Sequence, residues 1–170
     1  MTTLLLTRHG ETVDNANKIM QGQTQGELNA TGVAEAEQLA QKMKDEKIDA
    51  FVSSDLKRSI DTCRILAKPH GQGVKTTALL RERDWGSWTG KYIPSLQYLN
   101  EWPGDVESLA HLKARAQQFL DWIVAHYAGK TVMAVGHGIV NKAIQSVYYK
   151  KPMNEIAKMD NCEVRKLILE

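Results

Sequence analysis

The sequence has little of what marks membrane, disulfide-rich or nucleic-acid-binding proteins. Its 170 residues contain only two cysteines, Cys63 and Cys162, which lie far apart and form no Cys-x-x-Cys pair. This spacing favours free thiols over a disulfide or a metal site. No apolar run is long enough to cross a bilayer, and the short apolar N-terminal stretch has no basic region before it, unlike a signal peptide. The net charge is only +2 and the basic residues are scattered, so no basic stripe indicates a nucleic-acid surface. We expect a cytoplasmic protein with no nucleic-acid or membrane partner.

What is present is the composition of a globular chain, with 42% apolar and 25% charged residues. The length fits one domain with a core of its own, residues 1–170. Strand-like and helix-like segments alternate, which predicts an α/β fold: a three-layer α/β/α sandwich with a mostly parallel central sheet. The expected strands span residues 2–8, 48–55, 74–82, 130–138 and 163–169, and the expected helices span 31–47, with Thr31 as N-cap, 56–68, 105–127 and 139–150.

Two expected strands end in a histidine that is flanked by glycine. The first ends in "TRHGET", which contains Arg8 and His9, and a later one ends in "VGHG", which contains His137. In open α/β sheets, ligands bind at the carboxyl edge of the strands, and glycines there let a ligand approach the backbone. One such histidine is most simply an ordinary edge residue, but two in the same context predict a site.

Two further strand ends carry charged side chains with a simpler alternative explanation. Arg58 falls in the first turn of a helix, where a cation opposes the helix dipole and a bound anion would explain it. The alternative is a surface arginine paired with Asp55 or Asp61. Glu82 lies in "ALLRERDWG", for which a solvated turn is the alternative. Together, the four strand ends supply the groups for metal-free phosphoryl transfer: guanidinium groups for phosphate, a histidine nucleophile and a carboxyl group for proton transfer.

These motifs resemble, in order, those of the histidine phosphatase superfamily, also called the phosphoglycerate mutase-like family, in its short phosphatase branch. "TRHGET" matches the Arg-His-Gly signature, and "QGQTQGELNATG" resembles the stretch that follows it. "SSDLKRSIDTCRIL" resembles the segment with a second phosphate-binding arginine, "LLRERDWGSWTG" the proton-donor segment, and "VGHG" the second histidine. The resemblance covers almost the whole chain. It implies the family's α/β/α fold and phosphatase activity with no metal and no cofactor.

The resemblance also implies a role for each matching residue. His9 would be the phosphorylated nucleophile, and Glu82 would be the proton donor and acceptor. Arg8, Arg58 and His137 would clamp the phosphoryl group. The pocket for phosphate and substrate would also be lined by Asn15, Gln21 and Gly22. We expect the positive charge around His9 to keep its ring unprotonated near neutral pH.

The chain departs from the family's pattern at positions that bear on the substrate. Gln25 stands where the family often has Asp, Ser59 stands where it has Ala, and "PGDVES" replaces the commoner Pro-Gly-Gly-Glu-Ser. The segment between Glu82 and His137, which in the superfamily builds the cap over the pocket, is short here, and the expected cap spans about residues 84–106. The aromatic residues gathered there are Trp85, Trp88, Tyr92, Tyr98 and Trp102. Either these residues pack a minimal cap against the sheet, or one or two of them face the pocket and stack on an aromatic or sugar leaving group.

Three functions fit these motifs. The first is a phosphatase acting on a small phosphorylated metabolite. The second is a phosphoglycerate mutase, although the family's mutases use a longer cap and a C-terminal tail, and this sequence ends on an expected strand. The third is a non-catalytic phospho-ligand binding module, which the presence of both His9 and Glu82 disfavours. Phosphosugars, phosphoglycerate, phosphoserine, α-ribazole phosphate and nucleotides all have precedent in the family, and a homodimer is left open.

Overall fold

The computed structural model describes all 170 residues and confirms the α/β architecture. Five strands form one sheet in the order β3-β2-β4-β1-β5. Four of them run parallel, and β5 pairs antiparallel with β1 at one edge. The strands are β1 (Thr2–Arg8), β2 (Ala50–Ser53), β3 (Val74–Thr76), β4 (Thr131–Gly136) and β5 (Val164–Leu169).

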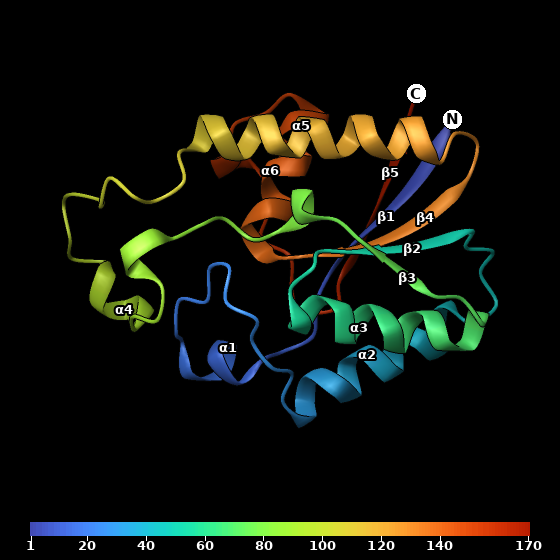
Figure 1. Cartoon of the computed structure of the whole chain (residues 1–170), viewed down its shortest axis with the longest axis horizontal. Helices are drawn as coiled ribbons and strands as arrows, with labels where there is room; N and C mark the ends of the chain where they lie inside the picture. The colour runs from blue at the N-terminus through green and yellow to red at the C-terminus, as the bar shows by residue number, and fades with distance from the viewer.

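Helices cover both faces of the sheet, with α2 and α3 on one side and α5 and α6 on the other (Figure 1). The α-helices are α1 (Val13–Asn17), α2 (Ala30–Met43), α3 (Lys57–Ala67), α4 (Ile93–Leu96), α5 (Leu109–His126) and α6 (Gly138–Tyr149). Short 3-10 turns occur at Lys68–His70, Ala78–Leu80, Gly86–Trp88 and Met153–Glu155. No helix combines the length and the apolar content that a membrane crossing requires.

The apolar run of β1 is explained by burial on both faces of the sheet. Leu4 and Leu6 are fully buried in the core beneath α5 and α6, whereas Leu5 belongs to the core beneath α2 and α3. Successive side chains of a strand point to opposite faces, so a strand covered on both sides is apolar throughout. Strand β1 lies between β4 and the edge strand β5, and its carboxyl end carries Arg8.

Helices α3 and α6 begin within one residue of the prediction, whereas the starts of α2 and α5 are set by capping side chains that the prediction did not identify. The side chain of Asn29, not that of Thr31, caps α2 by accepting the backbone N–H of Gly32 in its first turn. Helix α5 begins at Leu109 rather than at residue 105, since Ser108 caps its N-terminus. An N-cap side chain satisfies a backbone donor that has no partner within the helix, so the capping residue sets the boundary.

Two local elements also differ from the prediction. Strand β3 ends at Thr76, and the rest of the predicted strand 74–82 forms the 3-10 turn Ala78–Leu80. The short helix α1 has no counterpart among the predicted elements. A capping box between Thr12 and Asn15 holds it, with each side chain accepting the other residue's backbone N–H.

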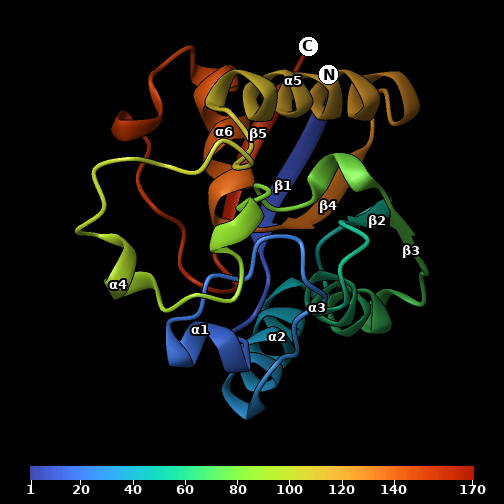
Figure 2. The same cartoon turned by 60° about the vertical axis from the view of Figure 1, so that its left-hand side comes forward.

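Residues 84–106 contain only one 3-10 turn and α4 as regular structure. Trp85 and Trp88 are buried in a small cluster of their own. The ring of Trp102 packs on both, with ring centroids 5.6 Å and 4.9 Å away. Tyr98, by contrast, is 86% exposed. Figure 2 shows α4 beside α1, away from the helices that cover the sheet.

Candidate active site

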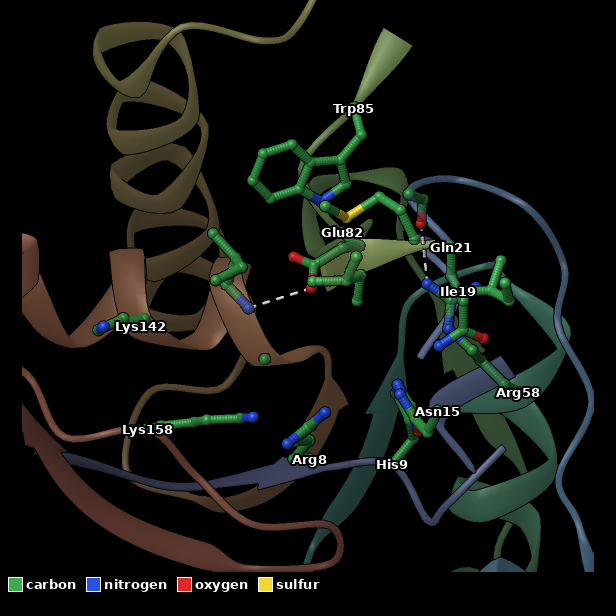
Figure 3. A pocket seen from close by; sticks show the side chains of 15 residues that line it. Arg8, His9, Asn15, Ile19, Gln21, Arg58, Glu82, Trp85, Lys142 and Lys158 are labelled. Carbon is green, nitrogen blue, oxygen red and sulfur yellow. Dashed lines mark hydrogen bonds between the residues drawn. The ribbon is translucent and has the colours of Figure 1, made fainter. Parts of the chain in front are cut away.

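The four strand ends singled out in the sequence meet at one edge of the sheet. Because β1 and β4 are hydrogen-bonded neighbours, His9 and His137 follow adjacent strands, and their ring centroids lie 5.0 Å apart. On the other side of β4, β2 leads into α3, which carries Arg58 in its first turn. Glu82 follows the 3-10 turn after β3. Figure 3 shows His9, Arg58 and Glu82 around one cavity.

His9 is buried and held in one orientation. It is 2% exposed, and its Nδ1 lies 2.7 Å from the carbonyl oxygen of Gly10. A carbonyl oxygen can only accept a hydrogen bond, so in the neutral ring Nδ1 carries the proton and Nε2 keeps its lone pair. Burial, together with the charges of Arg58 and Arg8, lowers the pKa of His9 to about 3. The ring is therefore neutral near pH 7, as predicted, but the largest cause is burial rather than the neighbouring charges.

His137 is fully buried at the N-cap of α6. Its Nε2 lies 2.7 Å from the hydroxyl oxygen of Ser54, and its Nδ1 is buried without a hydrogen-bond partner. Burial lowers the pKa of His137 well below its ordinary value, and the charge of Arg58 adds to this effect. The ring is therefore neutral, and Ser54 engages one of its two nitrogen atoms.

Arg58 is not a surface arginine, so the alternative interpretation of this residue is wrong. It is 1% exposed, and its guanidinium group donates to the carbonyl oxygens of Gly22, at 2.8 Å, and Thr24. Asp55 and Asp61 each pair with a different cation. The loop after α1 therefore holds Arg58 against the edge of the sheet.

The two arginines have donors to spare. One terminal nitrogen of Arg8 donates to the carbonyl oxygen of Met159 at 2.7 Å. The Nε atoms of Arg8 and Arg58 are buried without a partner, as is Nδ1 of His137. Burial lowers the pKa of Arg8, and it lowers that of Arg58 to about 10, although the charge of Glu82 opposes the shift in both. Both side chains are cations at neutral pH, so their free N–H groups are suited to anionic oxygens.

Backbone N–H groups orient the carboxyl group of Glu82 at the N-terminus of α6. Its Oε1 accepts from the backbone N–H of Arg83 at 2.8 Å and of Val140 at 2.9 Å, and its Oε2 accepts from that of Ile139 at 3.1 Å (Figure 3). Helix N-termini attract carboxylates. Glu82 is 9% exposed and lines the cavity.

A cavity of about 290 Å³ lies among these groups. The structure brings seven of the eight predicted site residues to its wall, and the eighth, His137, lies fully buried behind it. The seven are Arg8, His9, Asn15, Gln21, Gly22, Arg58 and Glu82. Of the aromatic residues in the cap segment, Trp85 alone lines this cavity. No group of three or more His, Cys, Asp or Glu side chains is placed to hold a metal ion.

Sequence reasoning missed two cations of the cavity wall, Lys142 and Lys158. Lys142 follows Gly138 and Ile139 by four and three residues on α6, and helical spacing of this kind places residues on one face. That spacing could have revealed it. Lys158 comes from a loop between the last 3-10 turn and β5, where no periodicity gives a signal.

Comparisons with known proteins identify relatives that cover most of the chain. The family model of the histidine phosphatase superfamily (branch 1) matches residues 4–170. A Yersinia enterocolitica protein named "Probable phosphoglycerate mutase GpmB" is 31% identical, over 98% of this chain and 85% of its own. A metal-independent phosphoserine phosphatase of Arabidopsis thaliana is 36% identical, over 85% of this chain and 67% of its own.

A solved structure shares the fold closely. The mycobacterial glucosyl-3-phosphoglycerate phosphatase in complex with VO3 superposes with a TM-score of 0.89 at 27% identity, covering 98% of this chain and 92% of that one. The family model matches residues 4–170, which include every strand end described above, and the two relatives cover 98% and 85% of the chain. The chain therefore belongs to the histidine phosphatase superfamily.

Proposed function

We propose that this protein is a metal-independent phosphatase that hydrolyses phosphate monoesters of small metabolites through a phosphohistidine at His9. The observation that carries the proposal is the arrangement around His9. A buried neutral imidazole has its Nδ1 committed to the carbonyl oxygen of Gly10 and lies beside buried nitrogen atoms that lack partners. The Arabidopsis and mycobacterial relatives, both named as phosphatases, support it.

In the first step, the Nε2 lone pair of His9 attacks phosphorus and the ester P–O bond breaks. The leaving oxygen takes a proton from the carboxyl group of Glu82. In the second step, Glu82 takes a proton from a water molecule as that water attacks the phosphohistidine, and the P–N bond breaks to release inorganic phosphate. Two easier displacements thus replace one difficult displacement, and the low pKa of His9, about 3, keeps the nucleophile unprotonated.

The phosphoryl group would be clamped by Arg8, Arg58 and His137. The free Nε–H groups of the two arginines supply charge-assisted hydrogen bonds that strengthen as charge develops on the phosphoryl oxygens. His137 can donate from Nδ1 only if that atom carries the ring's proton. The Ser54 hydroxyl, 2.7 Å from Nε2, favours this tautomer when it donates to Nε2. Ser54 would therefore act as a positioning residue.

Residues 84–106 would form a small cap over the leaving group, within one domain of residues 1–170. Trp85 supports this role because it lines the cavity while its ring is held in place. The Arg83 guanidinium carbon lies 4.9 Å from the centre of the Trp85 ring and 5.1 Å from that of Trp102. A fixed aromatic wall favours small leaving groups with an apolar surface.

The first experiment measures hydrolysis of p-nitrophenyl phosphate in excess EDTA. We expect turnover by the wild type and none by His9→Ala. His126→Ala is the matched control, because His126 is exposed and its ring hydrogen-bonds only to its own helix α5. The wild type should also retain labelled phosphate in an acid-labile, base-stable adduct. Undiminished turnover by His9→Ala would refute the mechanism.

A second experiment tests Glu82 as the proton donor. Glu82→Gln should slow alkyl phosphates more than aryl phosphates, because proton donation contributes about 10²–10⁴-fold only where the leaving oxygen needs the proton. An equal loss for both classes of substrate would indicate a structural role for Glu82 or an acid elsewhere, with Asp84 as the first candidate.

A phosphoglycerate mutase is the second candidate, favoured by the name of the Yersinia relative. A mutase needs the same phosphohistidine but must keep water away from it. Incubation with 3-phosphoglycerate separates the two functions. Release of inorganic phosphate supports the phosphatase, and formation of 2-phosphoglycerate with little hydrolysis supports the mutase.

A further inference from the structure

The cavity holds more positive charge than one phosphoryl group needs. Arg8, Arg58, Lys142 and Lys158 line it, and Glu82 is the one carboxylate among its lining residues. The proposed mechanism assigns the two arginines to the phosphoryl group. Neither lysine forms an ion pair with a side chain of this chain. Two ammonium groups therefore remain without an assigned partner at the wall of the cavity.

Lys158 is carried by a loop that is fixed to the catalytic edge. Arg8 donates to the carbonyl oxygen of Met159 at 2.7 Å, and the Met159 side chain is 1% exposed. Asn161 donates to the backbone carbonyl oxygen of His9 at 3.0 Å. The backbone on the C-terminal side of Lys158 is thus tied to the end of β1, while the side chain itself is exposed and extends toward Arg8 (Figure 3).

The position of Lys158 differs from that of a phosphoryl ligand. In the view of Figure 3, Arg8 is drawn between Lys158 and His9, and all three side chains line the same cavity. Lys142 points away from His9 in the same view. A group bound by Lys158 would therefore belong to the leaving group and not to the phosphoryl group attacked by His9.

The residues that line the cavity around Lys158 indicate which kind of group could bind there. Much of the remaining wall is apolar, formed by Ile19, Met20, Trp85, Ile93 and Ile139. A second cavity shares Lys158, but its charged lining is balanced, with three cations against three carboxylates: Arg8, Lys18 and Lys158 against Glu11, Glu35 and Asp160. The carboxylates of the second cavity offset its cations, whereas in the first cavity four cations stand against one carboxylate. An anionic group that binds Lys158 is therefore favoured on the side that faces His9.

We propose that Lys158 selects phosphate monoesters whose leaving group carries a second anionic group, such as a carboxylate a few atoms from the ester oxygen. This inference rests on the proposed phosphatase function, because the phosphoryl end of the ligand must lie at His9. Lys158 is a specificity-determining residue in this arrangement and takes no part in bond breaking.

The test uses two substrates that differ only at the end distant from phosphate. 3-Phosphoglycerate has a carboxylate where glycerol 3-phosphate has an uncharged hydroxymethyl group. We expect the wild type to prefer 3-phosphoglycerate in kcat/KM, and Lys158→Met to reduce that preference roughly tenfold through the loss of a charged hydrogen bond. Turnover of glycerol 3-phosphate should change little. Lys47→Met is the matched control, because Lys47 is also an exposed loop lysine but precedes β2 at the opposite edge of the sheet.

A binding experiment separates this inference from the proposed function. Calorimetry gives the dissociation constants of 3-phosphoglycerate and of glycerol 3-phosphate in the His9→Ala background, with and without Lys158→Met, and the ratio of these two constants is compared. If the wild type hydrolyses neither ester but the ratio still depends on Lys158, the phosphatase proposal fails and the anion selectivity stands. If Lys158→Met leaves the ratio unchanged, or weakens both ligands equally as a phosphoryl ligand would, the inference is overturned.

Discussion

Replacement of Arg115 by methionine should destabilise the fold and displace Glu82, although Arg115 does not line the cavity. Its guanidinium group joins α5 to the segment that carries Glu82. It donates to the carboxylate of Glu107 at 3.1 Å and 2.8 Å, and to the backbone carbonyl oxygens of Leu79, Arg81 and Glu82 at 3.0, 2.6 and 3.3 Å. The two charged side chains are 11% and 5% exposed.

The expected loss of stability follows from the burial of the ion pair between Arg115 and Glu107. Burial alone would raise the pKa of Glu107, but hydrogen bonds from Arg115 and from the backbone of Asp84, with the charge of Arg115, outweigh it and lower the pKa. Removing one partner of a buried ion pair costs about 3–5 kcal/mol, because the other charge is left uncompensated. In a chain of 170 residues, this loss lowers Tm by roughly 10 °C.

The assay combines urea unfolding, thermal unfolding and kinetics. Arg115→Met should lower the free energy of unfolding by about 3–5 kcal/mol. The control variant Arg64→Met, which removes an exposed arginine of α3, should have an unfolding free energy within about 0.5 kcal/mol of the wild type. The double variant Arg115→Met/Glu107→Gln should lose less unfolding free energy than the two single variants lose together, and the difference, which is the coupling energy, should be about 1–3 kcal/mol. Below the unfolding temperature, kcat for alkyl phosphates should fall more than the affinity for inorganic phosphate, because Glu82 moves while the phosphate-binding groups do not.

Two results would refute this reasoning. A Tm change of under about 2 °C for Arg115→Met would mean that the pair contributes no more than a surface ion pair. Additive losses in the double variant would mean that Arg115 and Glu107 do not act on each other. The first result would also mean that Arg115 does not support the segment that carries Glu82.

Three further predictions concern other parts of the site. The pKa of His9 is lowered to about 3 in the folded state and lies near 6.5 in the unfolded chain, so the unfolded state binds more protons between these two pH values. The free energy of unfolding should therefore rise with pH in this range by up to about 1.4 kcal/mol per pH unit. Urea unfolding at pH 4.5 and 6.5 should show a smaller rise for His9→Asn than for the wild type. A Cβ at Gly32 would overlap the backbone oxygen of Glu11, so Gly32→Ala should lower stability by about 1–3 kcal/mol, whereas Gly73→Ala, with open space around it, should be near neutral in the same unfolding assay. Ser54→Ala should lower kcat/KM in a folded protein, and ¹⁵N NMR of the histidine ring that Ser54 contacts should report loss of the Nδ1–H tautomer; an unchanged ring spectrum would exclude Ser54 from tautomer control.

The sheet and the cluster of strand ends could be predicted because both follow from local patterns. Burial on two faces makes β1 and β4 continuous apolar runs, and a parallel sheet places their carboxyl ends at one edge. That reasoning brought His9, His137, Arg58 and Glu82 together without any knowledge of side-chain geometry, and the structure places them around one cavity or directly behind it.

What sequence reasoning missed depends on contacts between residues distant in the chain. Arg58 appears free to pair with Asp61 one turn away, yet carbonyl oxygens of a loop more than 30 residues earlier bind its guanidinium group. The departure "PGDVES" is similar. Its Asp105 accepts hydrogen bonds from the backbone and the hydroxyl of Ser87 at 2.9 Å and 3.1 Å, which ties the two ends of the cap segment together. Periodicity and local propensity contain no information about such pairings.

The buried nitrogen atoms without partners explain why so much of the fold supports a small site. A buried polar group without a hydrogen bond destabilises a protein by about 1–3 kcal/mol, and Arg8, Arg58 and His137 each contribute one such atom. Their backbones are therefore held by the most constrained parts of the molecule: the central strands β1 and β4, and the first turn of α3. An anion that accepts hydrogen bonds from all three nitrogen atoms removes this cost and stabilises the folded state by mass action. In the proposed reaction, the same preorganisation that destabilises the free site would favour the charge distribution of a phosphoryl group in transfer.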